Sequence, residues 1–176
     1  KRRKASTTAP RFPVQRTAWG GCLRGRTLRH CTNGPRTHMP PAWSLHPQLE
    51  NDTHSLGDLP LSRVLVIKDA HYPWLLLVPR RADAVEIIDL GEVEQAQLMT
   101  EITRVSRALK TVTQCEKLNV AALGNAVPQL HVHIIARRRT DAAWPRPIWG
   151  VVPPLPYAPN ELEQFVDALR RKIWLE

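Results

Sequence analysis

The sequence predicts an α+β domain in which a mostly antiparallel sheet is accompanied by one long helix and a C-terminal helix. Three observations lead to this prediction. Short runs of Val, Ile and Leu, separated by turn residues, occur both before and after the middle of the chain. Between them, residues 92–113 carry apolar side chains at alternating spacings of four and three, which is the pattern of an amphipathic helix. Residues 160–173 near the C-terminus repeat this helical pattern.

The basic charge of the chain is concentrated in its first 38 residues. The whole sequence has 25 Lys plus Arg, 16 Asp plus Glu and a net charge of +9, but residues 1–38 hold ten of the basic residues and none of the acidic ones. We therefore expect a disordered basic tail over 1–38, which is a localisation signal, a nucleic-acid arm, or sequence not native to the domain, since Met39 precedes the patterned region. Residues 39–176 are nearly neutral and suffice for one domain, for which a nucleic-acid partner is not expected.

The three cysteines, Cys22, Cys31 and Cys115, form neither a disulfide framework nor a zinc pattern. No apolar run approaches the length of a membrane span. We therefore expect a cytoplasmic protein without a membrane partner.

The elements are predicted in chain order as follows. Residues 40–60 mix Pro, His, Asn, Asp and Gly and are expected to be an irregular lead-in. Two apolar runs then predict an antiparallel hairpin, with strands over Arg63–Lys68 and Trp74–Val78 and a Pro-containing break between them. The helix over 92–113 is expected to lie across the sheet. It is followed by a strand over Leu118–Leu123, a loop over Gly124–Pro128 and a strand over Gln129–Ala136.

The C-terminal helix is predicted to begin at Asn160, whose side chain can cap it while Glu163 reaches back. Its buried stripe consists of Leu162, Phe165, Leu169 and Ile173.

The strand over Gln129–Ala136 places Gln129, His131 and His133 on one face, because alternate side chains of a strand point the same way. Such a row permits nucleophilic catalysis by a neutral imidazole, metal binding by both imidazoles, or no chemistry at all. A metal site needs further ligands, and no Cys or carboxylate lies within a few residues of the pair. The remaining histidines of the domain, His46, His54 and His71, lie far upstream. Neither a metal nor another cofactor is therefore expected.

Residues 124–135, Gly-Asn-Ala-Val-Pro-Gln-Leu-His-Val-His-Ile-Ile, resemble the signature of the histidine triad (HIT) family, in which His, apolar, His, apolar, His and two apolar residues follow a glycine-containing loop. Residues 63–69 and 73–81 resemble the two preceding strands and their Pro-basic turn. The segment Trp144–Gly150 fits a bacterial subgroup similar to diadenosine tetraphosphate hydrolases. The resemblance covers roughly residues 60–140 and implies a HIT-like fold for residues 39–176.

The sequence departs from the family pattern at two positions. Gln129 stands in place of the first triad histidine, while the middle and third are present as His131 and His133. Ala126 stands where relatives often carry a Ser or Thr near the leaving group. The resemblance therefore implies either a working enzyme with less assistance to the leaving group or a nucleotide-binding module that has lost catalysis.

For a working enzyme, the resemblance implies that His131 attacks the α-phosphorus of a nucleotide derivative and forms a nucleotidyl-histidine intermediate. The small-molecule substrate is then of the dinucleoside polyphosphate or nucleoside phosphoramidate class. His133 and Gln129 are expected to donate hydrogen bonds to the phosphate oxygens. The protein is expected to be a homodimer, by analogy with the family.

Four further residues are candidates for binding the nucleotide. Gly124 and Asn125 form either a simple hairpin turn or a nest of N–H groups for phosphate. Asp69 is either the family's ribose contact or a turn residue, and Asn119 is either a second polar contact near the phosphates or a strand-edge residue.

For two segments that follow the signature, we favour a structural role over a role in the site. Trp144–Gly150 is expected to pack as a rigid belt over the sheet rather than to cover the pocket. Arg137–Arg139 is expected to be a solvated strand end in which only one arginine faces the site, rather than a phosphate clamp.

Overall fold

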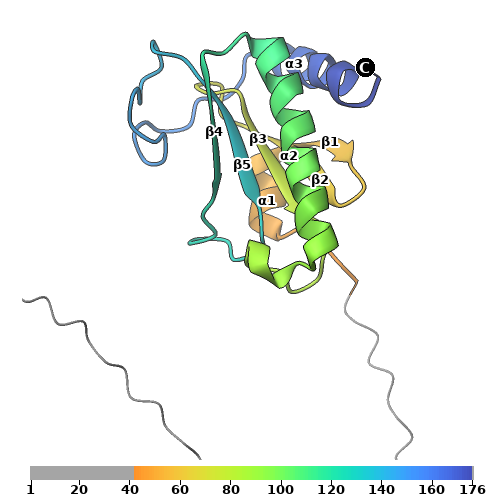
Figure 1. Ribbon diagram of the computed structural model, residues 1–176. Coiled ribbons are helices and arrows are strands. Elements are labelled where there is room, and N and C mark those ends of the chain that lie inside the picture. The colour runs from red at the N-terminus through yellow and green to blue at the C-terminus, as the bar shows by residue number, and fades with distance from the viewer. Residues whose placement is uncertain (1–41, 176) are drawn as a thin grey trace, which may run out of the picture. The chain divides into compact units, whose positions relative to one another are not determined.

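One antiparallel sheet of five strands organises the chain, in the spatial order β1-β2-β3-β5-β4 (Figure 1). The computed structural model describes residues 42–175, so the predicted basic tail over 1–38 lies outside the described residues. The strands are β1 (Thr53–Asp58), β2 (Ser62–Ile67), β3 (Trp74–Pro79), β4 (Lys117–Ala122) and β5 (Val132–Arg137). The helices are α1 (Pro47–Asp52), α2 (Glu92–Thr113) and α3 (Glu161–Arg170), with a 3-10 turn at Ile87–Asp89 and a π-helical turn at Arg171–Leu175.

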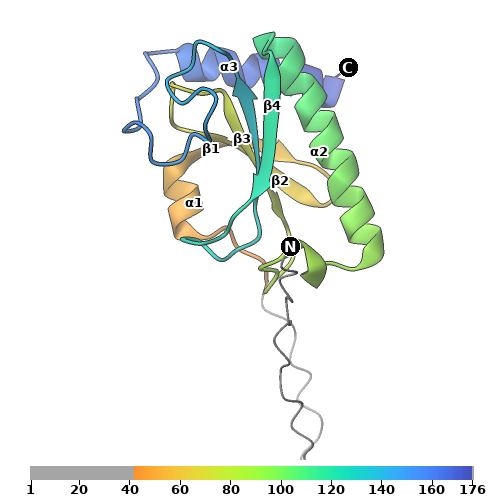
Figure 2. The same ribbon diagram turned by 60° about the vertical axis from the view of Figure 1, so that its left-hand side comes forward.

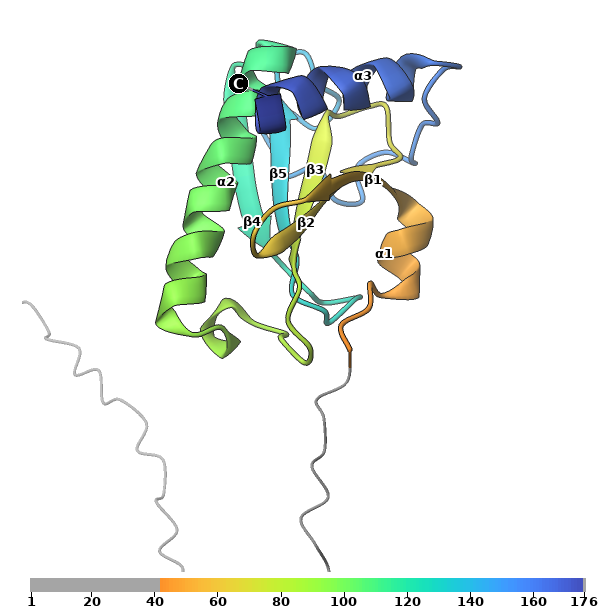
Figure 3. The ribbon, with the colours of Figure 1, turned by 90° about the vertical axis from the view of Figure 1, so that its right-hand side faces the viewer.

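Helix α2 lies along one face of the sheet, and the C-terminal helix α3 runs across the upper end of the strands in Figure 3 and contributes to the same core. The apolar stripe predicted for residues 92–113 is buried there, and Val105 and Leu109 are fully enclosed. They pack against side chains that point from the strands toward the helix, such as Val132 and Ile134 of β5. The predicted α+β fold with one long helix is therefore confirmed, and its main core lies between the sheet and α2.

The opposite face of the sheet is covered at two places and leaves the histidines between them. Helix α1 lies on this side, away from α2 (Figure 2), and its Leu49 packs with Leu76 of β3. The connection that follows β5 packs its Ile148 against Ile135. Because His133 is paired with Leu76 across β3 and β5, its side chain points to this second face.

The lead-in was predicted to be irregular, and this prediction is wrong for residues 47–58. They form α1 and the edge strand β1, which pairs with β2 through a bulge between Ser55 and Gly57. The sequence of β1, Thr-His-Ser-Leu-Gly-Asp, has no run of β-branched or aromatic residues, so its strand character comes from backbone pairing with β2.

Two predicted boundaries also differ from the structure. The signature strand begins at Val132 rather than Gln129, because the N–H of Leu130 is bonded to the carbonyl of Ala84 outside the sheet. Asn160 precedes α3 as predicted but adopts a left-handed conformation, with φ of 65°, and its side chain makes no capping bond. Among the described residues, no helix is both long and apolar enough to cross a membrane.

Candidate functional site

His131 and His133 line a pocket of about 510 Å³ on the second face of the sheet. Its walls come from the lead-in and α1, from β2 and β3, from the loop before β5 and from the connection after it. The lining residues are His46, Gln48, Leu49, Asp52, Ile67, Trp74, Leu76, Ala126, Val127, His131, His133 and Trp149. The two triad imidazoles are 7% and 6% exposed, so each presents only a small part of its ring to the pocket.

The ring of His131 is fixed by the backbone that leads into β5. Its Nδ1 lies 2.6 Å from the carbonyl oxygen of Gln129, and a carbonyl only accepts hydrogen bonds. Nδ1 therefore carries the proton, and in the neutral ring Nε2 keeps its lone pair. This is the protonation pattern that a nucleophilic imidazole needs.

The ring of His133 is held in the tautomer opposite to that of His131. The indole Nε1–H of Trp74 donates to Nδ1 of His133 over 3.0 Å, so in the neutral ring Nε2 carries the proton. Burial, followed by the nearby ring of His131, lowers the pKa of His133 from 6.5 to about 4. The two ring centroids are 4.9 Å apart. With both rings neutral, the site thus pairs one imidazole whose free nitrogen accepts with one whose free nitrogen donates.

The loop before β5 borders the same two histidines. A pocket of about 290 Å³ is lined by His131, His133, Gly124 and Asn125 together with Leu123, Ala126, Val127 and Trp149. Gly124 has a φ of 69°, a left-handed conformation that glycine adopts at little cost. The structure thus brings two of the predicted phosphate-binding residues, Gly124 and Asn125, beside the histidines.

The side chain of Gln129 is bonded to the backbone of the lead-in. Its Oε1 accepts from the N–H of His46 over 2.9 Å, and its Nε2 donates to the carbonyl of Ser44 over 2.8 Å. Gln129 is not among the described residues that line the two pockets. The amide of Gln129 is thus bonded to the lead-in backbone, and its expected contact with the phosphate oxygens stays a prediction.

Neither Asp69 nor Asn119 lines the two histidine pockets, and the two residues lie in different parts of the structure. Asp69 lines an adjoining pocket of about 450 Å³, which shares Asp52, Ile67 and Trp74 with the histidine pocket. One oxygen of its carboxylate accepts from the N–H groups of His71 and Leu155, and it also lies 3.0 Å from Nδ1 of His71.

Oδ1 of Asn119 accepts from the guanidinium of Arg137 over 2.6 Å, and Asn119 is not among the described residues that line the two histidine pockets. Arg137 is 1% exposed, so the prediction of a solvated strand end is wrong for this residue. Its Nε and one terminal nitrogen donate to the carboxylate of Asp141, and that terminal nitrogen also donates to the carbonyl of Arg146. Arg137 thereby ties β5 to the segment Trp144–Gly150.

That segment serves both purposes that were considered for it. Ile148 is buried against Ile135 and Tyr72, as expected of a belt over the sheet. Trp149 lines both histidine pockets, and its ring centroid lies 5.4 Å from that of His133. The segment therefore packs on the sheet and also covers the histidines.

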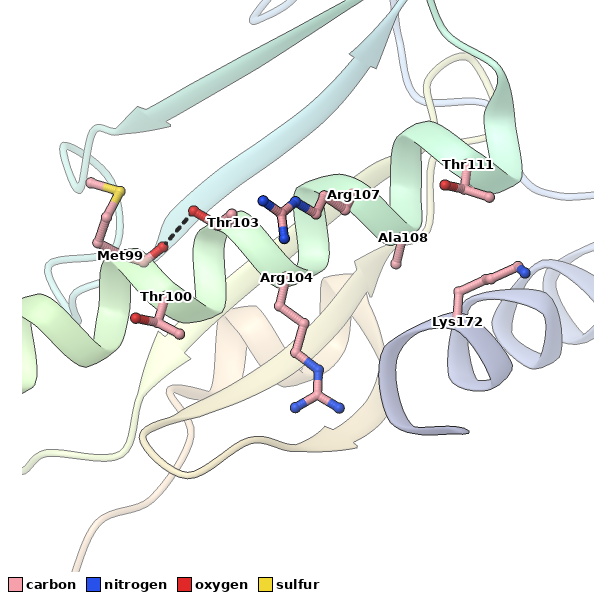
Figure 4. A pocket seen from close by; sticks show the side chains of 8 residues that line it. All are labelled: Met99, Thr100, Thr103, Arg104, Arg107, Ala108, Thr111 and Lys172. Atoms are coloured by element: carbon pink, nitrogen blue, oxygen red, sulfur yellow. Dashed lines mark hydrogen bonds between the residues drawn. The ribbon is translucent and has the colours of Figure 1, made fainter. Parts of the chain in front are cut away.

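A groove of about 610 Å³ lies elsewhere, along the outer side of α2 and beside the C-terminal helix (Figure 4). Its lining includes Arg104, Arg107 and Lys172 but no imidazole or carboxylate. Arg104 donates to the carbonyl of Ile173 and so joins α2 to the C-terminal turn. Within residues 42–175, no three His, Cys, Asp or Glu side chains lie together in a way that could hold a metal ion.

The sequence interpretation missed two residues of the histidine site. His46 was set aside as a distant histidine, although it lines the pocket of His131. Trp74 was assigned only to a strand, although it fixes the ring of His133. A signal existed for Trp74, because antiparallel pairing of its strand with the signature strand brings it next to His133. None existed for His46, which enters through the three-dimensional path of the lead-in.

Comparison with known proteins gives matches to one family. The HIT domain family matches residues 48–140. A histidine triad protein of Bradyrhizobium japonicum is 75% identical, with 76% of this chain and 100% of that chain covered and a TM-score of 0.75. A histidine triad protein of Sinorhizobium meliloti is 40% identical over 76% of this chain and 99% of that one, with a TM-score of 0.73.

A histidine triad protein of Marinobacter aquaeolei is also 40% identical, over 75% of this chain and 96% of that one, with a TM-score of 0.73. The comparison with curated proteins gave no match. The family match includes His131 and His133, and three solved relatives share the fold over nearly their whole length. The chain therefore belongs to the histidine triad (HIT) family.

Proposed function

We propose that this protein is a nucleotide-binding hydrolase or nucleotidyl transferase that cleaves at the α-phosphate of a nucleotide derivative through His131. The observation that carries the proposal is the 2.6 Å hydrogen bond from Nδ1 of His131 to the carbonyl of Gln129. It leaves Nε2 as a nucleophile that faces a pocket of about 510 Å³.

The reaction proceeds in two displacements. Nε2 of His131 attacks the α-phosphorus, a P–N bond forms, and the bond from phosphorus to the leaving group breaks with its electron pair on that group. Water, or the hydroxyl group of another acceptor in a transferase, then attacks the same phosphorus and loses its proton to solvent, and the P–N bond breaks with its electron pair on Nε2. The products are a nucleoside monophosphate or its transferred ester, and His131 regains its lone pair.

His133 stabilises the charge that develops on the phosphate. Its Nε2–H donor is fixed by the bond from Trp74, so it needs no rearrangement as the transition state forms. The backbone around Gly124 and Asn125, which lines a pocket together with both histidines, supplies further N–H donors. The adjoining pocket that Asp69 lines holds the nucleoside, with its carboxylate near the ribose hydroxyls.

The substrate class is a dinucleoside polyphosphate or a nucleoside phosphoramidate, as in the subgroup of diadenosine tetraphosphate hydrolases. The polyphosphate of a dinucleoside polyphosphate departs as a stabilised anion and needs little help, which suits a site with Ala126 beside the histidines, whereas the amine of a phosphoramidate must be protonated as it departs. The second candidate is a non-catalytic nucleotide-binding module of the same fold. It is favoured by Gln129, whose amide is bonded to the backbone of Ser44 and His46.

The assembly that goes with this function is a homodimer in the cytoplasm, formed through α2 and the edge strand β4. Strand β4 lies at the end of the sheet, and its Val120 is 49% exposed. Sedimentation of the wild type and of Val120→Lys tests the dimer, because a charged side chain at the interface shifts the protein to a monomer. A monomeric wild type overturns it.

The function is tested by intact-protein mass spectrometry, with the reaction quenched within seconds of mixing with dinucleoside polyphosphates and nucleoside phosphoramidates. We expect a mass increase of one nucleoside monophosphate on the wild type and none on His131→Ala. His54→Ala is the matched control, because His54 lies on β1 and should leave the adduct unchanged. Binding of nucleotides without an adduct or released monophosphate would establish the non-catalytic module.

A further inference from the structure

Gln129 holds the lead-in of the chain against the phosphate site. Its primary amide makes the two bonds that a peptide group makes across a sheet, accepting from the N–H of His46 and donating to the carbonyl of Ser44. The backbone of His46 is extended, with φ of −60° and ψ of 134°. In extended backbone, the carbonyl of one residue and the N–H of the second residue after it point to the same side, so one amide can reach both.

An amide suits this position better than the imidazole that the family has there. The donor and acceptor of glutamine are attached to one carbon atom and point in neighbouring directions, whereas the two ring nitrogens of histidine point apart. The bonds join residues that are 83 and 85 positions apart in sequence, so they fix the path of the lead-in over the site.

The consequence of this path is that His46 becomes part of the wall of the pocket that His131 also lines. Its half-buried side chain lines the pocket of about 510 Å³ together with His131 and His133. Nδ1 of His46 accepts from the N–H of Gln48 over 3.2 Å, so in the neutral ring the proton sits on Nε2. The pocket therefore holds three imidazoles, of which two are donors at Nε2.

His46 also lies outside the part of the chain that the HIT family matches, which begins at residue 48. Its role cannot be read from the family pattern, and Gln129 at the first triad position is the residue that connects the two parts. The change at the triad and the histidine of the lead-in therefore belong to one arrangement.

We propose that His46 contacts the phosphate of the bound nucleotide through Nε2–H and supplies the third imidazole of the site, and that Gln129 is the positioning residue that holds it there. This inference rests on the proposed function for its ligand, a nucleoside phosphate. It assigns Gln129 the role of positioning His46, so the glutamine at the first triad position no longer indicates that catalysis has been lost.

The test uses His46→Ser, Gln129→Ala and the double variant in the full chain, with His54→Ala as the histidine control. Serine retains the side-chain acceptor that caps α1 and removes the ring, which separates capping from phosphate contact. His46→Asn, with an amide donor and a capping oxygen, is the rescue variant. Binding of adenosine and guanosine monophosphate is measured by calorimetry, and kcat and KM by release of monophosphate.

Loss of one fixed donor lowers kcat by roughly 10² to 10³, so we expect a fall of this order in His46→Ser and partial recovery in His46→Asn. Gln129→Ala should show a smaller fall in the wild type and none in the His46→Ser background, because it acts through His46. Binding of monophosphate should weaken most in His46→Ser and less in Gln129→Ala, and it should partly recover in His46→Asn.

Two results would overturn the inference. The first is that His46→Ser matches His54→Ala in kcat and in monophosphate binding. The second is that the effects of Gln129→Ala and His46→Ser multiply, which would make them independent. A wild type that binds monophosphates without turnover refutes the proposed catalysis alone, since the binding series still decides the role of His46.

Discussion

The indole Nε1 of Trp74 donates a hydrogen bond to Nδ1 of His133 over 3.0 Å, from β3 to β5. Trp74 is paired with Ile135, two residues along from His133 on the same face of the sheet. Antiparallel pairing therefore places a donor beside an imidazole that the sequence separates from it by 59 positions. This contact sets the protonation of one half of the histidine pair, and the carbonyl of Gln129 sets the other.

Replacing Trp74 with Phe should release the ring of His133 while keeping most of the packing. A hydrogen bond contributes about 0.5–1.5 kcal/mol, so we expect kcat to fall by roughly two- to tenfold. The nitrogen chemical shifts of His133, measured by NMR, should change from one tautomer to a mixture. Trp149→Phe is the control, and unchanged shifts in Trp74→Phe would show that the indole does not fix the ring.

The lowered pKa of His133 predicts a loss of stability in mild acid. An unfolded histidine titrates near 6.5, and in the folded protein burial and His131 bring the pKa of His133 to about 4. Between these two pH values the unfolded chain binds a proton on this residue that the folded protein does not bind. The free energy of unfolding is therefore highest above pH 6.5 and decreases as the pH drops toward 4. The shift corresponds to roughly 3 kcal/mol.

Urea denaturation at several pH values between 7 and 4.5 measures this loss, with His133→Gln as the comparison. The variant should have a flatter profile across the window. Asp58 and Asp141 are present in both proteins, and their lowered pKa values place their titration below this range. Parallel profiles for the two proteins would contradict the prediction.

Arg137→Met should destabilise the protein strongly. The guanidinium is enclosed and binds Asp141, Asn119 and the carbonyl of Arg146. Removing one partner of a buried ion pair typically costs about 3–5 kcal/mol, because it leaves the other charge without compensation.

Arg139→Met is the matched control for this substitution, measured by the same urea denaturation. Arg139 pairs with Glu116 on the surface, where its side chain is 78% exposed. An exposed pair contributes about 0–1 kcal/mol, so the two variants should differ by several-fold. Equal losses would mean that Arg137 is replaceable by an apolar chain.

Glu101→Gln should destabilise the junction between α2 and β2. The buried carboxylate of Glu101 accepts from the N–H of Leu61 over 2.7 Å and of Ser62 over 3.0 Å. An amide would turn an N–H₂ group toward one of these donors, and a buried unsatisfied donor costs about 1–3 kcal/mol. Thermal unfolding measures the change, and the exposed Glu163→Gln should fall within about 0.5 kcal/mol of the wild type.

The elements with a strong hydrophobic period could be predicted from the sequence. The spacing of Leu98, Val105 and Leu109 gave the length and the buried face of α2, and the alternation around His131 gave the face on which both histidines lie. These patterns are local, because the period of a helix or strand appears within a few turns or residues of the chain itself.

Edge strand β1 and helix α1 could not be predicted in this way. Their polar residues carry no clear period, and β1 exists because β2 offers it a row of backbone partners. The bond of Arg170 to the carbonyl of Leu56 also holds β1 from the far end of the chain. A strand stabilised by its neighbours is visible only when the neighbours are placed.

The sequence by itself determined the family pattern and the two triad histidines, since both are written in consecutive residues. The tertiary structure alone decided which partner each polar side chain finds. In the folded chain, Gln129 is hydrogen-bonded to the backbone of the lead-in, Asn119 is hydrogen-bonded to Arg137, and His46 lines the pocket. The physical reason is that hydrogen bonds act over about 3 Å, and only the folded chain brings residues that are distant in sequence within that range.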